Sequence, residues 1–518
     1  MTSRIARASR VPTALACCTL AYAALAPTVL AQSGVDASGI TLQQAIDAVL
    51  EHGVQLQLGA RQVQTGEGAL LTAQAPFDPR FSSSLSTERS NSFAAATDPG
   101  ASAALTNTVA STFALPKRFR SGIVATPRVE IARAAMADVP VAPTSRASVA
   151  LDVTIPLLRD RGGGITTAAE RAARHSLDAA VLGARHSAAA SVLATVVAYW
   201  NDLAAEQRLE VYRSSEARAG QLVDDTRRLV EADERPAADL QQLLANLALK
   251  RAARLAGEQA GVEAAEQLAL AMGVRAGGMA TLPHPVTGFP AVIAIDSGAF
   301  HEYTGEAAEA RSHRADLAAL TEDRTAAEVR SRAARDGMRP RLDLVMTIGY
   351  QGVTAARGLG GALSSFYRNV PGTDASVQLS YELPLASLAA RGEALRSRAA
   401  YEAARVREAE LARQISSGVR VAREALRHGR EALLAAREAV TLSRQAVENE
   451  KRKFQLGMST LFDVILAEDA LTNARLSEIA GQQAYAVAIA RLRYETGAIL
   501  VADGSVLTVS ADSLEREP

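Results

Sequence analysis

The sequence predicts a mostly helical protein in which long coiled-coil hairpins are joined to β-strands that form a membrane β-barrel shared between chains. Three observations indicate this fold. Apolar residues recur every seven positions at Val419, Leu426, Leu433, Val440, Val447, Phe454 and Leu461, a repeat that keeps one helix face against a partner. Several short segments alternate apolar and polar residues, which is typical of strands with one apolar face. The same order of elements occurs twice along the 518 residues.

The N-terminal segment, residues 1–31, has the pattern of a secretory signal peptide. Three arginines, at positions 4, 7 and 10, precede an apolar run that ends at Ala31. Both cysteines, Cys17 and Cys18, lie within this segment. We therefore expect a secreted mature chain without disulfides or thiolate chemistry.

The composition argues against nucleic acid as a partner. The chain has 56 basic and 56 acidic residues, so no cationic surface for nucleic acid is predicted. Aromatic residues make up only 4% of the sequence, and alanine is abundant. This mixture favours long helices in close contact.

The first structural repeat is expected over residues 32–274. A helix from Ile40 to about Ala75 is capped by Thr41 and ends at Pro76. Outer-membrane strands follow at about 80–157, and the clearest of them is Ser148–Pro156, with alternate residues apolar.

The segment from Arg89 to Arg146 has two interpretations, a surface loop or an added hairpin. The hairpin would pair Thr108–Leu115 with Ser121–Ile131 around Lys117-Arg118. The sequence thus predicts four strands per chain, or six if this hairpin forms. An added hairpin would extend the barrel outside the cell.

A long helical hairpin is predicted at residues 164–273, interrupted at Asp233–Pro236 and ended by Gly273. Residues 275–304, rich in proline and glycine, indicate a linker or equatorial segment. The second repeat, 305–497, contains a helix to Arg335, strands at about 341–385 and the helical hairpin 391–497. A C-terminal equatorial tail, 498–518, completes the chain.

The second hairpin shows its tip most clearly. Residues 391–456 would form a rod of roughly 100 Å, too long for a compact domain. Gly457 ends this helix, and Ser459 or Thr460 can cap the next one. The tip therefore lies near residues 456–460.

The two halves align at nearly constant offsets, which indicates duplication. The strand that begins at Ser148 corresponds to the one at Ser376, with 376 − 148 = 228. The hairpin tips give 463 − 239 = 224 for Asp463 and Asp239, and Gly273 and Gly497 give the same difference. Each half then supplies one long rod and shorter helices that stack to the same length. Four strands are too few to close a pore alone, so several chains must share one barrel.

These motifs resemble those of the TolC-like outer-membrane efflux and secretion channels. The resemblance covers most of the mature chain and includes Thr41-Leu42-Gln43-Gln44-Ala45, Arg314-Ala315-Asp316-Leu317 and the tip sequence Leu456-Gly457-Met458-Ser459-Thr460-Leu461-Phe462-Asp463-Val464. It implies a homotrimer with a twelve-stranded barrel in the outer membrane and a twelve-helix tunnel across the periplasm. It also implies an inner-membrane pump and a periplasmic adaptor (membrane fusion) protein as partners.

The resemblance also implies functional residues. Asp463, with Asp239 as its repeat mate, matches the position that lines the periplasmic aperture. Three converging Asp463 carboxylates would repel one another and raise their pKa values. The alternative is that Asp463 only occupies the first turn of a helix, where the helix dipole favours an acidic residue.

Two further sets of residues are candidates. Leu456, Gly457, Met458, Ser459 and Thr460 match the groove where adaptor hairpins dock, and the alternative is a helix cap with nothing bound. Tyr350 and Tyr381, in strands, are candidates for an aromatic belt at the lipid interface. Tyr199 and Trp200 are expected to pack between helices instead.

No catalytic constellation, cofactor site or metal site is predicted. The histidines, including His175, His186, His313 and His428, have no ligand spacing, and no serine has a paired histidine and aspartate context. The leading hypothesis is a passive, gated conduit in the cell outer membrane that extends into the periplasm. The alternative is a periplasmic coiled-coil structural or adaptor protein.

Overall fold

The computed structural model describes residues 39–92, 104–136, 142–233, 236–274, 284–292, 306–355, 360, 364, 373–503 and 506–516. The predicted signal peptide, most of the linker at 275–304 and the segments 93–103 and 137–141 lie outside the described residues. The predicted extents of the signal peptide and of the linker therefore remain predictions.

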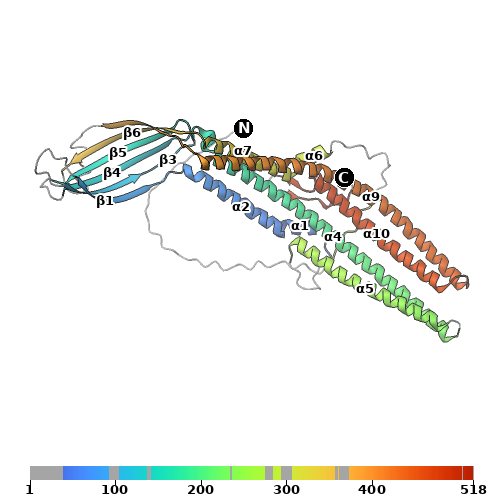
Figure 1. Cartoon of the computed structure of the whole chain (residues 1–518). Helices are drawn as coiled ribbons and strands as arrows, with labels where there is room; N and C mark the ends of the chain where they lie inside the picture. The colour runs from blue at the N-terminus through green and yellow to red at the C-terminus, as the bar shows by residue number, and fades with distance from the viewer. Residues whose placement is uncertain are drawn as a thin grey trace, which may run out of the picture. The chain divides into compact units, whose positions relative to one another are not determined.

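Helices make up most of the described chain (Figure 1). They are α1 (Leu42–His52), α2 (Val54–Gln74), the 3-10 helix η1 (Ala75–Phe77), α3 (Gly163–Thr166), α4 (Ala168–Glu231), α5 (Ala237–Met272), α6 (Glu306–His313), α7 (Ala315–Asp336), α9 (Leu388–Gln455), α10 (Leu461–Glu495) and α11 (Ala511–Glu515). The two rods, α4 and α9, have 64 and 68 residues, close to the predicted lengths.

The seven-residue seam of α9 is buried, as predicted, against α6 and α7 at Val419 and against α10 from Leu426 to Val447. Val419, Leu426, Leu433, Val440 and Val447 are all buried. Leu426 and Leu433 share a cluster with buried residues of α10, and Val440 and Val447 share another. The repeat therefore fixes how the second hairpin closes along its length.

Two helices expected to be continuous are each broken, at equivalent places in the two halves. Gly53 has φ −56° and ψ 124° between α1 and α2, and Arg314 has φ −74° and ψ 115° before α7. The break has a packing reason, because α1 buries one apolar face whereas α2 has no buried residue. A Cβ on Gly53 would lie 2.4 Å from the Val49 carbonyl oxygen, so the turn needs glycine.

The strands form one large antiparallel sheet and one small one. The strands are β1 (Ser82–Ser92), β2 (Ala104–Ala114), β3 (Lys117–Arg118), β4 (Val124–Met136), β5 (Thr144–Pro156), β6 (Arg341–Thr354), β7 (Thr373–Glu382), β8 (Val501–Asp503) and β9 (Val506–Thr508). The large sheet has the order β1-β2-β4-β5-β6-β7, with β3 paired to β4 (Figure 1). Six long strands, not four, thus come from the described chain.

The hairpin predicted between residues 89 and 146 forms, and it turns around Lys117-Arg118, as predicted. β2 and β4 pair from Thr106↔Met136 to Ala114↔Arg128. Their connection lies beside the helices, since Arg120 bonds to Glu170 of α4. The added hairpin is therefore confirmed as part of the sheet, and its extension of the barrel outside the cell stays a prediction.

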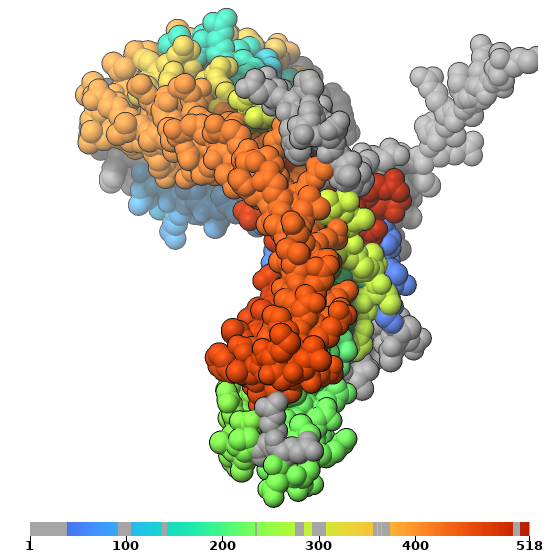
Figure 2. Space-filling model, turned by 90° about the vertical axis from the view of Figure 1, so that its right-hand side faces the viewer, coloured from blue at the N-terminus to red at the C-terminus, as the bar shows by residue number. Residues whose placement is uncertain are grey.

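The duplication is visible in the arrangement of the helices. The hairpin of α4 and α5 and the hairpin of α9 and α10 lie side by side (Figures 1 and 2). Helix α7 packs against both rods, α4 and α9. Gly273 and Gly497, which end the two return helices, have φ of 75° and 76°. The predicted helix ends are therefore built the same way in both halves.

The largest apolar cluster joins the two termini of the described chain to the middle of α4. Tyr199 and Trp200 are fully buried there and meet edge to face at 5.1 Å. The Tyr199 hydroxyl donates to the Ile40 carbonyl at 3.0 Å and accepts from the Thr287 amide at 2.8 Å. This confirms that both aromatics pack between elements.

Among the described helices, α4 is the one with an apolar stretch long enough to cross a bilayer by length and composition. Val192, Val196, Tyr199 and Trp200 of this helix belong to the buried cluster around α1. The apolar stretch therefore has a packing explanation.

The break before α7 is held by an ion-pair cluster. Arg314, only 8% exposed, donates to Asp316 at 2.7 and 3.0 Å and to Glu495 of α10 at 2.9 Å. Its guanidinium also lies 4.9 Å from the Tyr494 ring centre. Burial alone would raise the pKa of Asp316, but the hydrogen bond and charge of Arg314 lower it below its ordinary value.

We predict that Arg314→Met destabilises the protein strongly. Two carboxylates would remain in a buried site without their cation, which costs about 3 kcal/mol or more. Arg311→Met is the matched control, because Arg311 is exposed and bonds to its own helix at Ala307. Thermal unfolding followed by circular dichroism should show a much larger loss for Arg314→Met. Equal losses for the two variants would contradict the role of the cluster.

Candidate functional site at the helical tips

The tip of the second hairpin is closed by a capping box. Gly457 has φ 70°, and α10 begins with Thr460 as its N-cap. The Thr460 amide donates to Asp463 Oδ2 at 3.0 Å, and the Asp463 amide donates to Thr460 Oγ1 at 3.3 Å. Each side chain thus satisfies a backbone donor at the start of the helix.

This bonding accounts for Asp463 within a single chain. Hydrogen bonds from the Thr460 side chain and amide lower the pKa of Asp463 below its ordinary value. Ser459 also donates to Asp463 Oδ2 at 3.3 Å. The capping interpretation is therefore observed, and the aperture role, with its opposite effect on the pKa, stays a prediction about the assembled protein.

The first tip has the same backbone plan with different residues. Asp233 has φ 61° at the position equivalent to Gly457, since 457 − 224 = 233. Pro236 is the N-cap of α5 and makes no side-chain cap. Asp239 is the third residue of α5, as Asp463 is of α10. The structure thus places the two predicted aspartates at equivalent positions, one beside each tip.

The tip of the second hairpin exposes apolar side chains. Leu456 and Met458 are 73% and 74% exposed, and Phe462 and Leu466 are exposed by more than half. The sequence prediction included Leu456 and Met458 but missed Phe462 and Leu466 as surface residues. Their spacing of four places both on the face of α10 away from the buried Leu461 and Val464.

Ion pairs between the two hairpins were not predicted. Arg218 of α4 bonds to Glu468 of α10 at 2.7 Å, and Lys250 of α5 pairs with Asp469 of α10. Glu468 also pairs with Lys451 of α9 at 2.6 Å. No pattern in the sequence predicts the contacts between the hairpins, because the partners are up to 250 residues apart.

These pairs border a groove between the hairpins with a volume of about 360 Å³. Burial alone would raise the pKa of Glu468, but Lys451 and Arg218 lower it below its ordinary value. Glu468 therefore stays ionised and holds α4, α9 and α10 together just above the tips.

The sheet places the two tyrosines on one face. Val149 pairs with Tyr350, and Leu342 pairs with Tyr381. Since residues separated by an even number along a strand share a face, Tyr381 lies at the helical end of the same face on which Tyr350 lies further out. Their role at a lipid interface remains a prediction.

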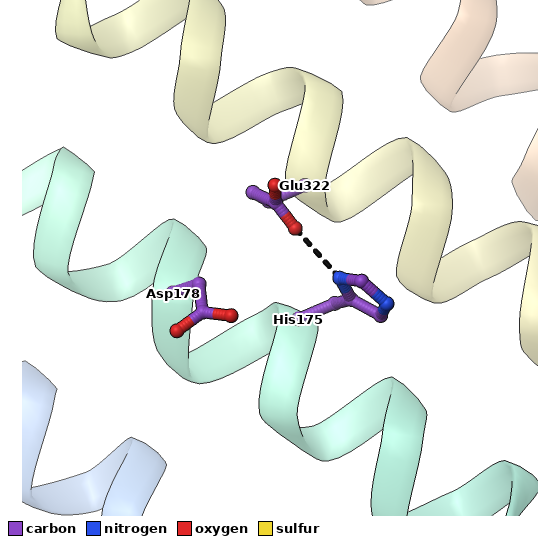
Figure 3. A group of neighbouring side chains, drawn as sticks. All are labelled: His175, Asp178 and Glu322. Atoms are coloured by element: carbon purple, nitrogen blue, oxygen red, sulfur yellow. Dashed lines mark hydrogen bonds and ion pairs between the residues drawn. The ribbon is translucent and has the colours of Figure 1, made fainter.

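Among the described residues, one group of three side chains could hold a metal ion, although the sequence predicted no metal site. His175 and Asp178 of α4 and Glu322 of α7 have ligand atoms within 4.8 Å of one another (Figure 3). His175 Nδ1 lies 2.6 Å from Glu322 Oε2, so this pair already forms an interhelical hydrogen bond. The sequence could not indicate the group, because Glu322 is 147 residues from His175.

Comparison with known proteins identifies the fold. No protein-family model and no curated protein sequence matches the chain. The structure is similar to the outer membrane protein VceC from Vibrio cholerae, with 18% identity over 88% of this chain and 96% of that one and a TM-score of 0.63. It is also similar to the Campylobacter jejuni outer membrane channel CmeC, with 14% identity, 88% and 85% coverage and a TM-score of 0.64.

The outer-membrane channel OprN gives a TM-score of 0.65 at 15% identity, covering 88% of this chain and 90% of that one. The chain therefore has the fold of outer-membrane channel proteins, mostly helical with an antiparallel sheet and duplicated helical hairpins.

We predict that two substitutions at the equivalent tip positions have opposite effects on stability, because one removes a glycine and the other introduces one. Gly457→Ala places a Cβ in the left-handed region and should destabilise its tip by about 1 kcal/mol, whereas Asp233→Gly should relieve a smaller strain. Hydrogen exchange measured by mass spectrometry should become about fivefold faster around residue 457 in the first variant. Unchanged exchange in both variants would contradict the assignment of the tips.

Proposed function

We propose that this chain is a subunit of a homotrimeric exit channel in the outer membrane, serving a tripartite efflux or type I secretion system. The channel is a passive, gated conduit that spans the outer membrane and the periplasm. The observation that carries the proposal is a sheet with an exposed apolar face that continues directly into helical rods. A soluble periplasmic coiled-coil protein would have the rods, but it does not explain the exposed apolar face of the sheet.

The exposed face of the sheet suits lipid. Val377 and Leu379 of β7 and Ile348 of β6 are each more than 60% exposed. They lie on the same face as Tyr350 and Tyr381, because the register pairs Ile348 with Ala375 and Met346 with Val377. Strands of 10 to 14 residues are long enough to cross a bilayer when tilted.

The rods suit a tunnel across the periplasm. At 1.5 Å per residue, the 64 residues of α4 span about 96 Å. The shorter helices α2 and α5 both pack along α4, and α7 and α10 both pack along α9. Each chain thus contributes four helix widths to a wall, which supports the twelve-helix tunnel that the resemblance implies for a trimer.

The tips are the proposed contact with other components of the system. The exposed Leu456 and Met458, with Phe462 and Leu466 beside them, form an apolar surface next to the turn at Gly457. An apolar surface at the end of a rod suits the docking of a periplasmic adaptor hairpin. An inner-membrane pump would supply the energy, since this chain supplies the path.

The alternative, a periplasmic coiled-coil structural or adaptor protein, predicts release from the cell envelope without detergent. Its sheet would have to cover the exposed apolar face with another soluble domain. In the described residues, no other element of the chain covers that face.

The aperture prediction is tested with Asp463→Ala. If three Asp463 carboxylates line the opening, the variant should show weaker block by divalent cations and altered conductance in planar bilayers. Glu448→Ala is the control, because Glu448 is exposed on α9 away from the turn. Identical cation block in the wild type and Asp463→Ala would remove Asp463 from the aperture.

We expect the ion pairs between the two hairpins to restrain the opening of the channel at the tips. The double variant Arg218→Gln with Lys250→Gln removes the two cations of the first hairpin that pair with carboxylates of α10, so the hairpins should separate more readily and the mean conductance should rise several-fold. Arg254→Gln is the control, because Arg254 pairs with Glu216 and Glu258 inside the first hairpin. A double variant with unchanged conductance would show that these pairs do not restrain opening.

A further inference from the structure

The large sheet contains an insertion that the second half of the chain lacks. In the second half, β6 and β7 lie between α7 and α9 as a simple pair. In the first half, β2, β3 and β4 are inserted between β1 and β5. Since the insertion adds two long antiparallel strands, β1 still runs away from the helices and β5 still returns to them.

The inserted strands have the same apolar face as the others. One row of neighbours across the sheet runs through Phe113, Val129, Val149 and Tyr350, from β2 to β6. Phe113 and Val149 are 39% and 45% exposed. β2 and β4 therefore continue the face that we assign to lipid.

The opposite face is polar across the same strands. A row from β2 to β6 runs through Thr112, Glu130, Ser148 and Gln351. Nearer the helices on the same face, Arg128 of β4 forms an ion pair with Asp152 of β5 at 2.9 Å. The Thr347 hydroxyl of β6 also donates to Asp152, at 2.7 Å. This alternation is the pattern of barrel strands between lipid and an aqueous lumen.

The turn of the insertion is fastened to the helices. Arg120, between β3 and β4, donates to both carboxylate oxygens of Glu170 at 2.9 and 3.0 Å. Glu170 is buried at the start of α4, and Gln74 of α2 donates to it at 3.3 Å. The inserted hairpin is therefore part of the junction between sheet and helices.

The sheet ends in two open edges. Within the described part of the chain, β1 pairs only with β2 and β7 only with β6. β1 and β7 are 11 and 10 residues long, and neither contains proline. Long, exposed edges of this kind pair with other strands unless they are blocked. β1 runs away from the helices and β7 returns, so two copies would pair antiparallel.

We propose that β7 of each copy pairs with β1 of the next, so that three copies close an eighteen-stranded barrel in place of the twelve-stranded barrel that the resemblance implies. The proposal rests on the trimeric channel of the proposed function. Three copies of six strands give eighteen. An even number of strands per copy keeps every pair antiparallel around the ring.

The strand count sets the width of the exit. With strands 4.8 Å apart and tilted by about 40°, eighteen strands give a diameter of about 36 Å between backbones, and twelve give about 24 Å. Twelve helices at about 10 Å spacing form a ring about 38 Å across. The insertion therefore widens the barrel to match the helical tunnel, and the lumen area at the membrane becomes about twofold larger.

The test is electron cryo-microscopy of the full-length wild type and of a variant that lacks residues 104–136, both in detergent. The deletion removes β2, β3 and β4 and leaves the order β1-β5-β6-β7. We expect eighteen strands in the wild-type trimer and twelve in the deletion trimer, with the barrel diameter reduced about 1.5-fold.

A wild-type trimer with twelve strands in its wall, and with β1 and β2 outside the ring, would overturn the inference while leaving the channel intact. A wild-type particle that is not a trimer would instead contradict the proposed function. The wild-type count decides the question even if the deletion variant does not assemble.

Discussion

The proposed channel depends on one constraint, that a β-sheet in lipid cannot leave its edge backbone groups without hydrogen-bond partners. Within the described residues, the sheet of this chain has a polar face, an apolar face and two open edges, so in the proposed channel it is complete only as part of a ring. A ring of sheets requires a ring of the helices attached to them. In this proposal, the long, duplicated rods continue the same wall as the sheet.

Within one chain, different interactions join the helices to one another and to the sheet at different heights. Near the sheet, Arg120 and Glu170 fasten the inserted turn to α4. At mid-height, Arg314 bonds to Asp316 and Glu495, and Tyr199 and Trp200 are buried beside the chain ends. Near the tips, Arg218 and Lys250 of the first hairpin pair with Glu468 and Asp469 of α10.

Much of this fold could be predicted from the sequence, because its strongest signals are periodic. The seven-residue seam predicted α9 and its tip, and the alternation at Ser148–Pro156 predicted β5. The breaks at Gly53 and Arg314 were missed, since each depends on distant packing that propensity does not report. The added hairpin was left open because serine, threonine and alanine suit both a loop and a polar strand face.

The candidate site was less predictable for the same reason. Asp463 and Thr460 are neighbours in sequence, so their capping box could be foreseen. The pairs Arg218 with Glu468 and Lys250 with Asp469 join residues more than 200 positions apart, and a sequence without periodic constraint gives no register for such contacts. The proposed aperture would be formed by several copies, so a single chain does not test it.

The most direct test of the central claim is the mass of the particle extracted with detergent from isolated outer membranes, corrected for bound detergent. We expect three mature chains per particle, because in the proposed channel only sheets shared between chains close the barrel. A monomer, or release of the chain into the soluble periplasmic fraction, would contradict it.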